Sequence, residues 1–186
     1  MSLHYIFWHW PRGGVDLGVY AGKLVRFQEE VENYLGGDLP GETAAYRSAP
    51  PPWIPPDVTA FSDWYAVENG TLFDKLSDVT AGPAVKVAHS ELAALYGGGA
   101  GSLYDYKKGY AFDPTFVQYT HWFAKPTGMS YDDFYALLEP ITSLPNATLL
   151  RRRMVLGPSP EFCLASEKLY ELPGPIVAYT LQMSRL

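Results

Sequence analysis

Residues 4–21 read HYIFWHWPRGGVDLGVYA, and residues 117–136 read VQYTHWFAKPTGMSYDDFYA. The second stretch repeats a pattern of the first at a constant spacing of 115 positions, with Pro11, Gly13, Tyr20 and Ala21 matched by Pro126, Gly128, Tyr135 and Ala136. In both stretches an aromatic strand leads through a turn with proline and glycine into an amphipathic helix. A strand–turn–helix unit cannot bury its apolar faces alone, so the two copies predict a pair of fused, pseudo-symmetric units.

The residues after the first copy complete one folding unit. Asp16 can cap a helix that ends at the glycines 36 and 37. The patterns that follow predict strands over 43–49, 57–67 and 102–110 and helices over about 71–80 and 84–96, with Gly97–Gly101 as a linker. The order β-α-β-β-α-β is that of the ferredoxin-like unit.

The second copy is shorter. Its helix is predicted to begin at Ser130, and strands are expected at about 147–156, 161–171 and 176–184. Residues 172–175 alone separate the last two strands, so this copy lacks its second helix. The predicted fold is α+β: a first ferredoxin-like repeat over 1–112 and a second, truncated ferredoxin-like repeat over 113–186.

A sheet that lacks a covering helix exposes apolar side chains unless another element packs there. We therefore expect the longer helix of the first repeat to cover the sheet of the second repeat, or else a partner subunit to do so in a homodimer.

The composition limits the classes of partner. The formal net charge of −6 disfavours nucleic acid, because binding to phosphates requires a basic surface. A single cysteine, Cys163, excludes an internal disulfide and is typical of the reducing cytoplasm. The sequence has no apolar stretch of membrane-spanning length, so we expect no membrane partner. The aromatic share of 15% fits an aromatic-lined cavity and an aromatic core equally well.

Four stretches carry a resemblance to a known group of proteins: residues 10–27, 64–78 (WYAVENGTLFDKLSD), 101–109 (GSLYDYKKG) and 125–141 (KPTGMSYDDFYALLEPI). They resemble the EthD-like branch of the dimeric α+β barrel superfamily. The resemblance implies two four-stranded sheets that face each other, with helices outside and a cavity between the sheets, here built within one chain. Members of that superfamily include cofactor-free monooxygenases, polyketide cyclases, lactone isomerases and haem-degrading enzymes, so the fold alone selects no reaction.

The histidines of the two aromatic strands are candidate general bases. Strand alternation places His4 and Trp8 on one face, and the 115-residue offset places Tyr119, His121 and Phe123 on the equivalent face of the second copy. The resemblance implies that a histidine at the position of His4 points into the cavity. We expect His4 and His121 to converge inside the barrel, with Trp8, Tyr119 and Phe123 as stacking walls for a ligand. An imidazole there could take a proton from a phenol or an activated carbon acid, and the alternative is a hydrogen-bonded core residue.

Two further pairs of charged residues occupy matched places in the repeats. Arg47 and Arg151 fall in the second strands, and Asp63 and Glu167 fall in the third strands. Carboxylate and guanidinium groups on adjacent strands can pair. These four residues are therefore predicted either to orient a substrate oxygen at a polar end of the cavity or to form ordinary cross-strand ion pairs.

These features predict a barrel that binds a small aromatic or apolar molecule. We expect it to act without a cofactor or metal, by proton transfer, cyclisation or monooxygenation; haem held by one interior histidine is a further alternative. A different class, a non-catalytic binding or assembly protein with a barrel filled by side chains, remains open. The bulk of Trp8 and Trp10 favours a filled barrel.

Overall fold

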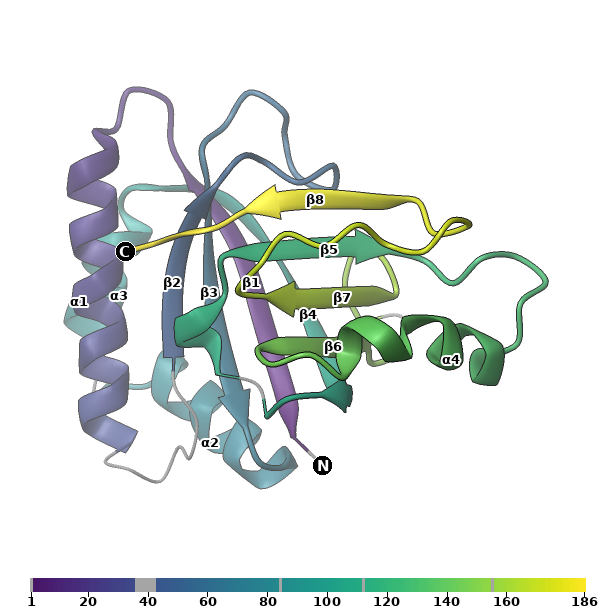
Figure 1. The fold of residues 1–186 in the computed structure, drawn as a ribbon. Helices are drawn as coiled ribbons and strands as arrows, with labels where there is room; N and C mark the ends of the chain where they lie inside the picture. The colour runs from purple at the N-terminus through teal and green to yellow at the C-terminus, as the bar shows by residue number, and fades with distance from the viewer. Residues whose placement is uncertain (1, 36–42, 84, 112, 155) are drawn as a thin grey trace.

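The computed structural model describes residues 2–35, 43–83, 85–111, 113–154 and 156–186 (Figure 1). The first half of the chain contributes β1 (Leu3–Pro11), α1 (Leu17–Leu35), β2 (Thr43–Ser48), β3 (Ala60–Val67), α2 (Gly70–Ala81), α3 (Lys86–Ala93) and β4 (Tyr96–Gly109). The second half contributes the 3-10 helix η1 (Pro114–Phe116), β5 (Tyr119–Phe123), α4 (Tyr131–Thr142), β6 (Ala147–Arg152), β7 (Phe162–Ser166), β8 (Ala178–Gln182) and β9 (Ser184–Arg185). None of the helices among the described residues is long and apolar enough to cross a membrane.

All strands join one antiparallel sheet in the order β8-β5-β7-β6-β4-β1-β3-β2-β9. The orders β4-β1-β3-β2 and β8-β5-β7-β6 are the same ferredoxin-like arrangement used twice. β8 and β9 are consecutive segments at the C-terminus; β8 pairs with β5 and β9 pairs with β2, so the sheet forms a nearly closed barrel. The predicted fold class is thereby confirmed, whereas the division of the chain at residue 112 stays a prediction.

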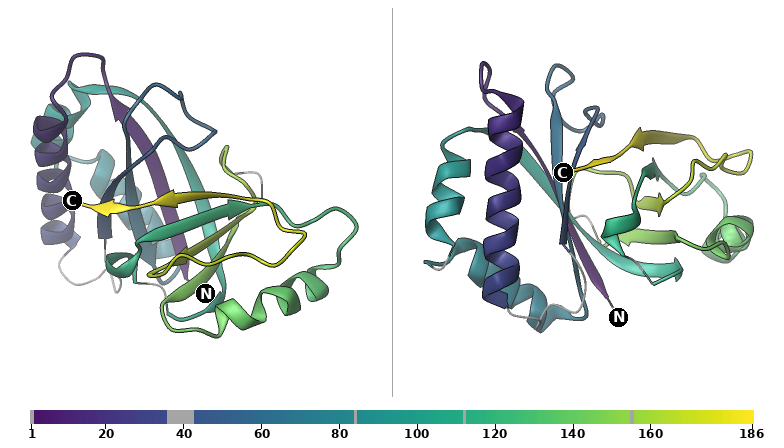
Figure 2. Two further views of the ribbon diagram at one scale, coloured as in Figure 1. Left: turned by 45° about the horizontal axis from the view of Figure 1, so that its top comes forward. Right: turned by 60° about the vertical axis from the view of Figure 1, so that its left-hand side comes forward.

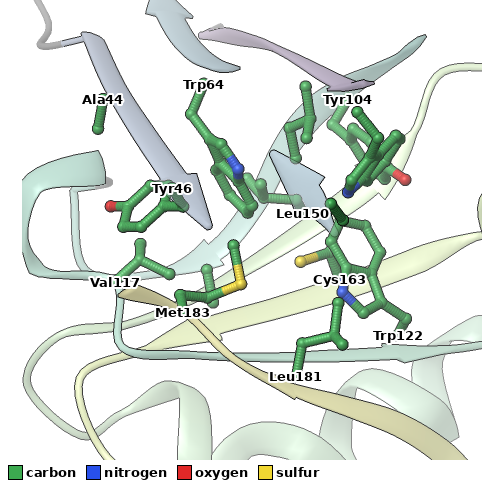
Figure 3. Packing of buried hydrophobic residues seen from close by; sticks show 14 of the residues in the cluster. Ala44, Tyr46, Trp64, Tyr104, Val117, Trp122, Leu150, Cys163, Leu181 and Met183 are labelled. Carbon is green, nitrogen blue, oxygen red and sulfur yellow. The ribbon is translucent and has the colours of Figure 1, made fainter. Parts of the chain in front are cut away.

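Aromatic side chains fill the interior of the barrel. Trp8, Trp53 and Trp122 form a triangle, with ring centroids 5.1–5.2 Å apart and planes at 70–77° to one another. Trp64 and Tyr104 approach Trp122 from β3 and β4, and Figure 3 shows these rings converging with aliphatic side chains of the second half. A barrel of about eight strands is just wide enough for its side chains to fill it. The expected cavity between the sheets is therefore occupied by a packed core.

Hydroxyl groups orient two of these buried indoles. Trp64 Nε1 donates to Ser62 Oγ over 3.0 Å, and Trp122 Nε1 donates to Thr120 Oγ1 over 2.8 Å. Each acceptor lies two residues before its tryptophan, on the same face of the strand. The two halves of the barrel thus hold their central indoles by the same local device.

Helices α1, α2 and α3 cover the outer face of the first half of the sheet, and α4 covers part of the second half (Figure 2). Residues 167–177, between β7 and β8, form no helix, but Tyr170, Leu172 and Ile176 from this segment pack onto the cluster under α4. Helix α1 packs on the first half, so the expectation that it covers the second repeat is wrong. Cover by a partner subunit stays a prediction.

The glycine-rich segment 97–101 is the beginning of β4 and not the predicted linker. It pairs with β1, whose aromatic rings lie across it. A Cβ at Gly99 would lie 2.6 Å from Phe7 Cζ, and one at Gly101 would lie 2.5 Å from the Tyr5 hydroxyl. Glycine is needed in this strand because another element approaches its backbone closely.

We expect Trp122→Ala to destabilise the protein strongly, because it opens a cavity at the centre of the aromatic cluster. The free energy of unfolding should fall by about 3–5 kcal/mol, measured by urea denaturation followed by far-ultraviolet circular dichroism. Phe116→Ala is the matched control: Phe116 is 54% exposed, and its loss should change the free energy by less than about 0.5 kcal/mol. Equal effects of the two substitutions would contradict the central role of Trp122.

Candidate functional site

A cavity of about 500 Å³ lies between the outer face of the first-half sheet and helices α1, α2 and α3. Pockets of this size take small organic ligands. The side chains that line it come mainly from β1, β3 and the three helices: Tyr5, Phe7, His9, Tyr20, Phe27, Asp63, Tyr65, Ser77, Thr80, Ala81, His89, Leu92, Ala93 and Tyr96. This cavity therefore lies under the helices, on the face of the sheet opposite the barrel core.

Nearly parallel aromatic rings form one wall of this pocket. Tyr5, Phe7 and His9 project from the same face of β1, with successive ring centroids 6.2 and 5.6 Å apart and planes within 15° of each other. Tyr96 lies parallel to Phe7 at 6.5 Å. The glycines of β4 leave room for these rings, so the wall presents flat faces on which a planar molecule can stack.

A polar cluster interrupts the aromatic wall. The Nδ1 atom of His9 lies 2.6 Å from the Tyr20 hydroxyl of α1, and its Nε2 lies 3.6 Å from Oδ2 of Asp63 on β3. The other carboxylate oxygen, Oδ1, accepts a hydrogen bond of 3.1 Å from Nε2 of Gln28. His9 and Asp63 are only 2% and 5% exposed. An imidazole thus sits between a buried carboxylate and a hydroxyl, an arrangement suited to proton transfer.

Burial and the Asp63 charge keep the nearby tyrosines protonated. Burial, together with the carboxylate, raises the pKa of Tyr5 to about 12 and shifts the pKa of Tyr20 further upward. The pKa of Tyr65 is also raised well above its ordinary value by burial and by Asp63. These three phenols therefore remain neutral at neutral pH.

The second half of the chain shows what the fold accepts at the positions of this cluster. Trp8 and Trp122 both point into the barrel, where their rings pack together, and so mark equivalent positions on β1 and β5. Phe123 and Phe134 follow Trp122 at the same spacing at which His9 and Tyr20 follow Trp8. Leu164 pairs with the residue before Trp122, as Asp63 pairs with the residue before Trp8.

All three counterparts are apolar and buried in the cluster under α4. The rings of Phe123 and Phe134 contact each other in a tilted arrangement, as the rings of His9 and Tyr20 do in the first half. Burying polar groups costs free energy unless they are fully hydrogen-bonded. Since the fold accepts an apolar set at these positions, packing alone does not explain His9, Tyr20 and Asp63.

The structure corrects the predicted faces of β5. The segment between Trp122 and Pro126 is one residue longer than the segment between Trp8 and Pro11. The 115-residue offset that aligns the two prolines therefore misaligns β1 and β5 by one residue. A shift of one residue moves every side chain of a strand to the other face. Tyr119, His121 and Phe123 therefore lie on the outer face, and Trp122 takes the inner position.

The two predicted general bases do not converge. His4 lies on the barrel face, as predicted, with Nε2 3.1 Å from the Ser2 hydroxyl. His121 lies on the opposite face, with Nδ1 2.8 Å from Oγ1 of Thr180. Burial lowers the pKa of each imidazole to about 4, which makes both of them weak bases at neutral pH. Their catalytic role has no support from this placement.

The four charged candidates also separate. Arg151 pairs with Glu161 at 2.8 Å, and Glu167 accepts a hydrogen bond of 2.8 Å from Asn146. Arg47 is exposed on β2, where Ala45 and not Arg47 lies opposite Asp63. The predicted Arg47–Asp63 and Arg151–Glu167 pairs are therefore wrong, because strand register places other residues next to each carboxylate. Asp63 alone reaches the pocket.

The sequence analysis missed His9, Tyr20 and Gln28 as site residues. Tyr20 and Gln28 are on α1, where Tyr20 fits the apolar stripe of the helix, and His9 is on the strand face opposite His4. The signal in the sequence is that polar residues of the first repeat have apolar counterparts in the second. This difference is visible only when β1 and β5 are aligned on Trp8 and Trp122. Within the described part of the chain, His, Cys, Asp and Glu side chains form no group of three that could hold a metal ion.

Comparison with known proteins supports the fold. The sequence matches no model of a protein family and no curated protein. A candidate monooxygenase from Fusobacterium nucleatum superposes with a TM-score of 0.61 at 10% identity, over 100% of this chain and 92% of the other. A candidate monooxygenase from Lactobacillus acidophilus gives 0.58 at 9% identity, over 99% and 93%. An anthrone oxidase-like protein gives 0.52 at 11% identity, over 98% and 91%. At these identities the similarity establishes a shared α+β barrel fold and no more.

We expect the stability of the protein to fall as the pH is lowered from about 6.5 to about 4. His4 and His121 stay neutral in the folded protein, because their pKa is about 4, while the unfolded chain takes up protons below its ordinary histidine pKa. Each histidine should contribute a slope of at most about 1.4 kcal/mol per pH unit in this range. Urea denaturation at several pH values should show a shallower slope for His121→Gln than for the unmodified protein; an unchanged slope would contradict neutral burial of His121.

Gly99→Ala should destabilise the protein by about 1–3 kcal/mol, because small-to-large changes in packed regions force neighbours to move. The added Cβ would lie 2.8 Å from the Trp8 carbonyl oxygen and 2.6 Å from Phe7 Cζ. Gly174→Ala is the control, since a Cβ there meets no atom within 4 Å. Urea denaturation measures both, and similar values for the two variants would argue against close packing of β1 on β4.

Proposed function

We propose that the chain binds a small, largely aromatic molecule in the pocket under α1, α2 and α3 and removes a proton from it through Tyr20, His9 and Asp63. The observation that carries this proposal is the buried polar cluster in a pocket whose counterpart in the second half is apolar. Groups of titratable side chains that are gathered in a cleft at a cost in stability are typical of functional sites.

The geometry supports a relay with His9 as the base. A proton on Nε2 of His9 faces the Asp63 carboxylate, which leaves Nδ1 to accept the hydroxyl proton of Tyr20. As Tyr20 gives this proton to His9, its oxygen takes a proton from the bound molecule, so the hydroxyl is restored. Asp63 stabilises the positive charge that the imidazole gains. Gln28 holds the carboxylate in place through its amide.

The remainder of the pocket favours an aromatic ligand. The parallel rings of Tyr5, Phe7 and Tyr96 offer stacking faces, and Phe27 and Leu92 close the side formed by the helices. Loss of a proton from a phenol or an activated ring C–H gives an electron-rich anion. Such an anion can isomerise, cyclise or react directly with O2, and none of these steps requires a cofactor.

Among these outcomes we favour oxidation by O2. Two proteins of the same fold are named as candidate monooxygenases and a third as anthrone oxidase-like. Their similarity lies in the fold, so the choice of reaction depends on the pocket and on a direct assay. Anthrone is a suitable probe, because one anthrone and one O2 give one anthraquinone and one water after loss of an activated proton.

The assay follows O2 consumption and anthraquinone absorbance with the purified protein and anthrone. We expect His9→Phe to lower the rate by at least about 100-fold, since a positioned general base contributes 10²–10⁴-fold. Phenylalanine is the residue at the equivalent position of the second half, so the variant should fold, and circular dichroism checks this. His121→Asn tests the assignment made from sequence, and a loss in that variant alone would favour it.

An unchanged rate in His9→Phe would contradict the relay. Binding of anthrone without turnover, seen as quenching of protein fluorescence, would favour the alternative of a non-catalytic binding protein. Neither binding nor turnover, for anthrone and for other tricyclic phenols, would contradict a pocket for aromatic ligands.

A further inference from the structure

We infer that this pocket selects its ligand by charge: it accepts an aromatic molecule whose polar group is neutral or cationic and excludes one whose polar group is a carboxylate. The inference rests on the proposed function, because it concerns the ligand of the same pocket.

The charges that line the pocket are unbalanced. Asp63 is the one carboxylate among the described lining residues, and neither lysine nor arginine is among them. The lining histidines are His9, which must be neutral to act as a base, and His89, which is exposed on α3 beside Phe27. The pocket therefore has a net negative charge when it is ready to take a proton.

Two basic side chains of α1 near the pocket are already paired. Lys23 and Arg26 of α1 both contact the carboxylate of Glu91 on α3, at 2.5 and 3.0 Å. These ion pairs link α1 to α3 and direct the positive charges of Lys23 and Arg26 at the Glu91 carboxylate. It does not supply a cation to the buried carboxylate.

The Asp63 carboxylate is incompletely compensated within the protein. Its hydrogen bond from Gln28 comes from a neutral amide, and the His9 Nε2 atom at 3.6 Å is beyond hydrogen-bond distance. A buried carboxylate is stabilised by hydrogen-bond donors or by a positive charge. A ligand hydroxyl would supply a hydrogen-bond donor to this carboxylate, and a ligand ammonium group would supply a positive charge.

The aromatic side chains that line the pocket also favour a cationic ligand over an anionic one. The faces of Tyr5, Tyr20 and Tyr96 carry the negative side of the ring quadrupole and attract cations. Their hydroxyls remain protonated and add no positive charge. A ligand carboxylate would meet a like charge in a partly buried site, where an effective dielectric constant of about 20 leaves repulsion strong enough to weaken binding by at least about tenfold.

Three probes with one ring system separate charge from shape: 2-naphthol is neutral at pH 7, 2-naphthylmethylamine is a cation and 2-naphthoate is an anion. Isothermal titration calorimetry with the purified chain should give dissociation constants for the first two that are at least about tenfold lower than that of naphthoate. Equal affinity for naphthol and naphthoate would overturn charge selection and leave the pocket as a binding site. Failure of all three probes to bind would count against the proposed function and the inference together.

Substitution of Asp63 locates the origin of the selection. Asp63→Asn keeps the size of the side chain, and Asp63→Leu introduces the residue that the second half has at the equivalent position. In both variants the ratio of naphthoate to naphthol affinity should rise at least about tenfold. Asp57→Asn is the control: it changes the net charge equally, but Asp57 is exposed and lies outside the pocket lining. An unchanged ratio in both Asp63 variants, or an equal rise in Asp57→Asn, would overturn the inference.

Discussion

The packing of Trp8, Trp53 and Trp122 at the centre of the barrel is the interaction on which the remainder of the structure depends. These rings come from both halves of the chain and meet edge to face at 5.1–5.2 Å. They bury large apolar surfaces and pack the two halves of the sheet against each other. The interior is occupied, and a cavity of about 500 Å³ lies instead on the outer face of the sheet, under α1, α2 and α3.

The layer between the sheet and its covering helices contains different kinds of side chain in the two halves of the barrel. Under α4, Phe123, Phe134 and Leu164 form an ordinary apolar core, and the equivalent layer of the first half contains an imidazole, a phenol and a carboxylate. Such groups cost stability when buried. The first half also keeps a cavity, which a layer selected only for stability would fill. The second half thus serves as scaffold and the first half as the proposed site.

The glycines of β4 connect the fold to this site. Their missing side chains allow the rings of Tyr5 and Phe7 to lie across the strand, and this arrangement makes the flat wall of the pocket. The same segment resembles a linker in sequence, since consecutive glycines ordinarily punctuate secondary structure. Pairing with β1 and close contact with its rings override that local preference.

The sequence by itself determined the α+β class, the repeated ferredoxin-like order and the absence of a helix between β7 and β8, because hydrophobic periodicity and turn residues act locally. It also determined that His4 and Trp8 share the barrel face of β1. Only the tertiary structure decided which face of β5 is buried in the barrel. The offset that aligns Pro11 with Pro126 misaligns β1 and β5 by one residue, and a shift of one residue exchanges the two faces of a strand. The tertiary structure likewise decided the site: His9, Tyr20 and Asp63 are far apart in the chain, and their meeting depends on strand register and on the packing of α1 against the sheet.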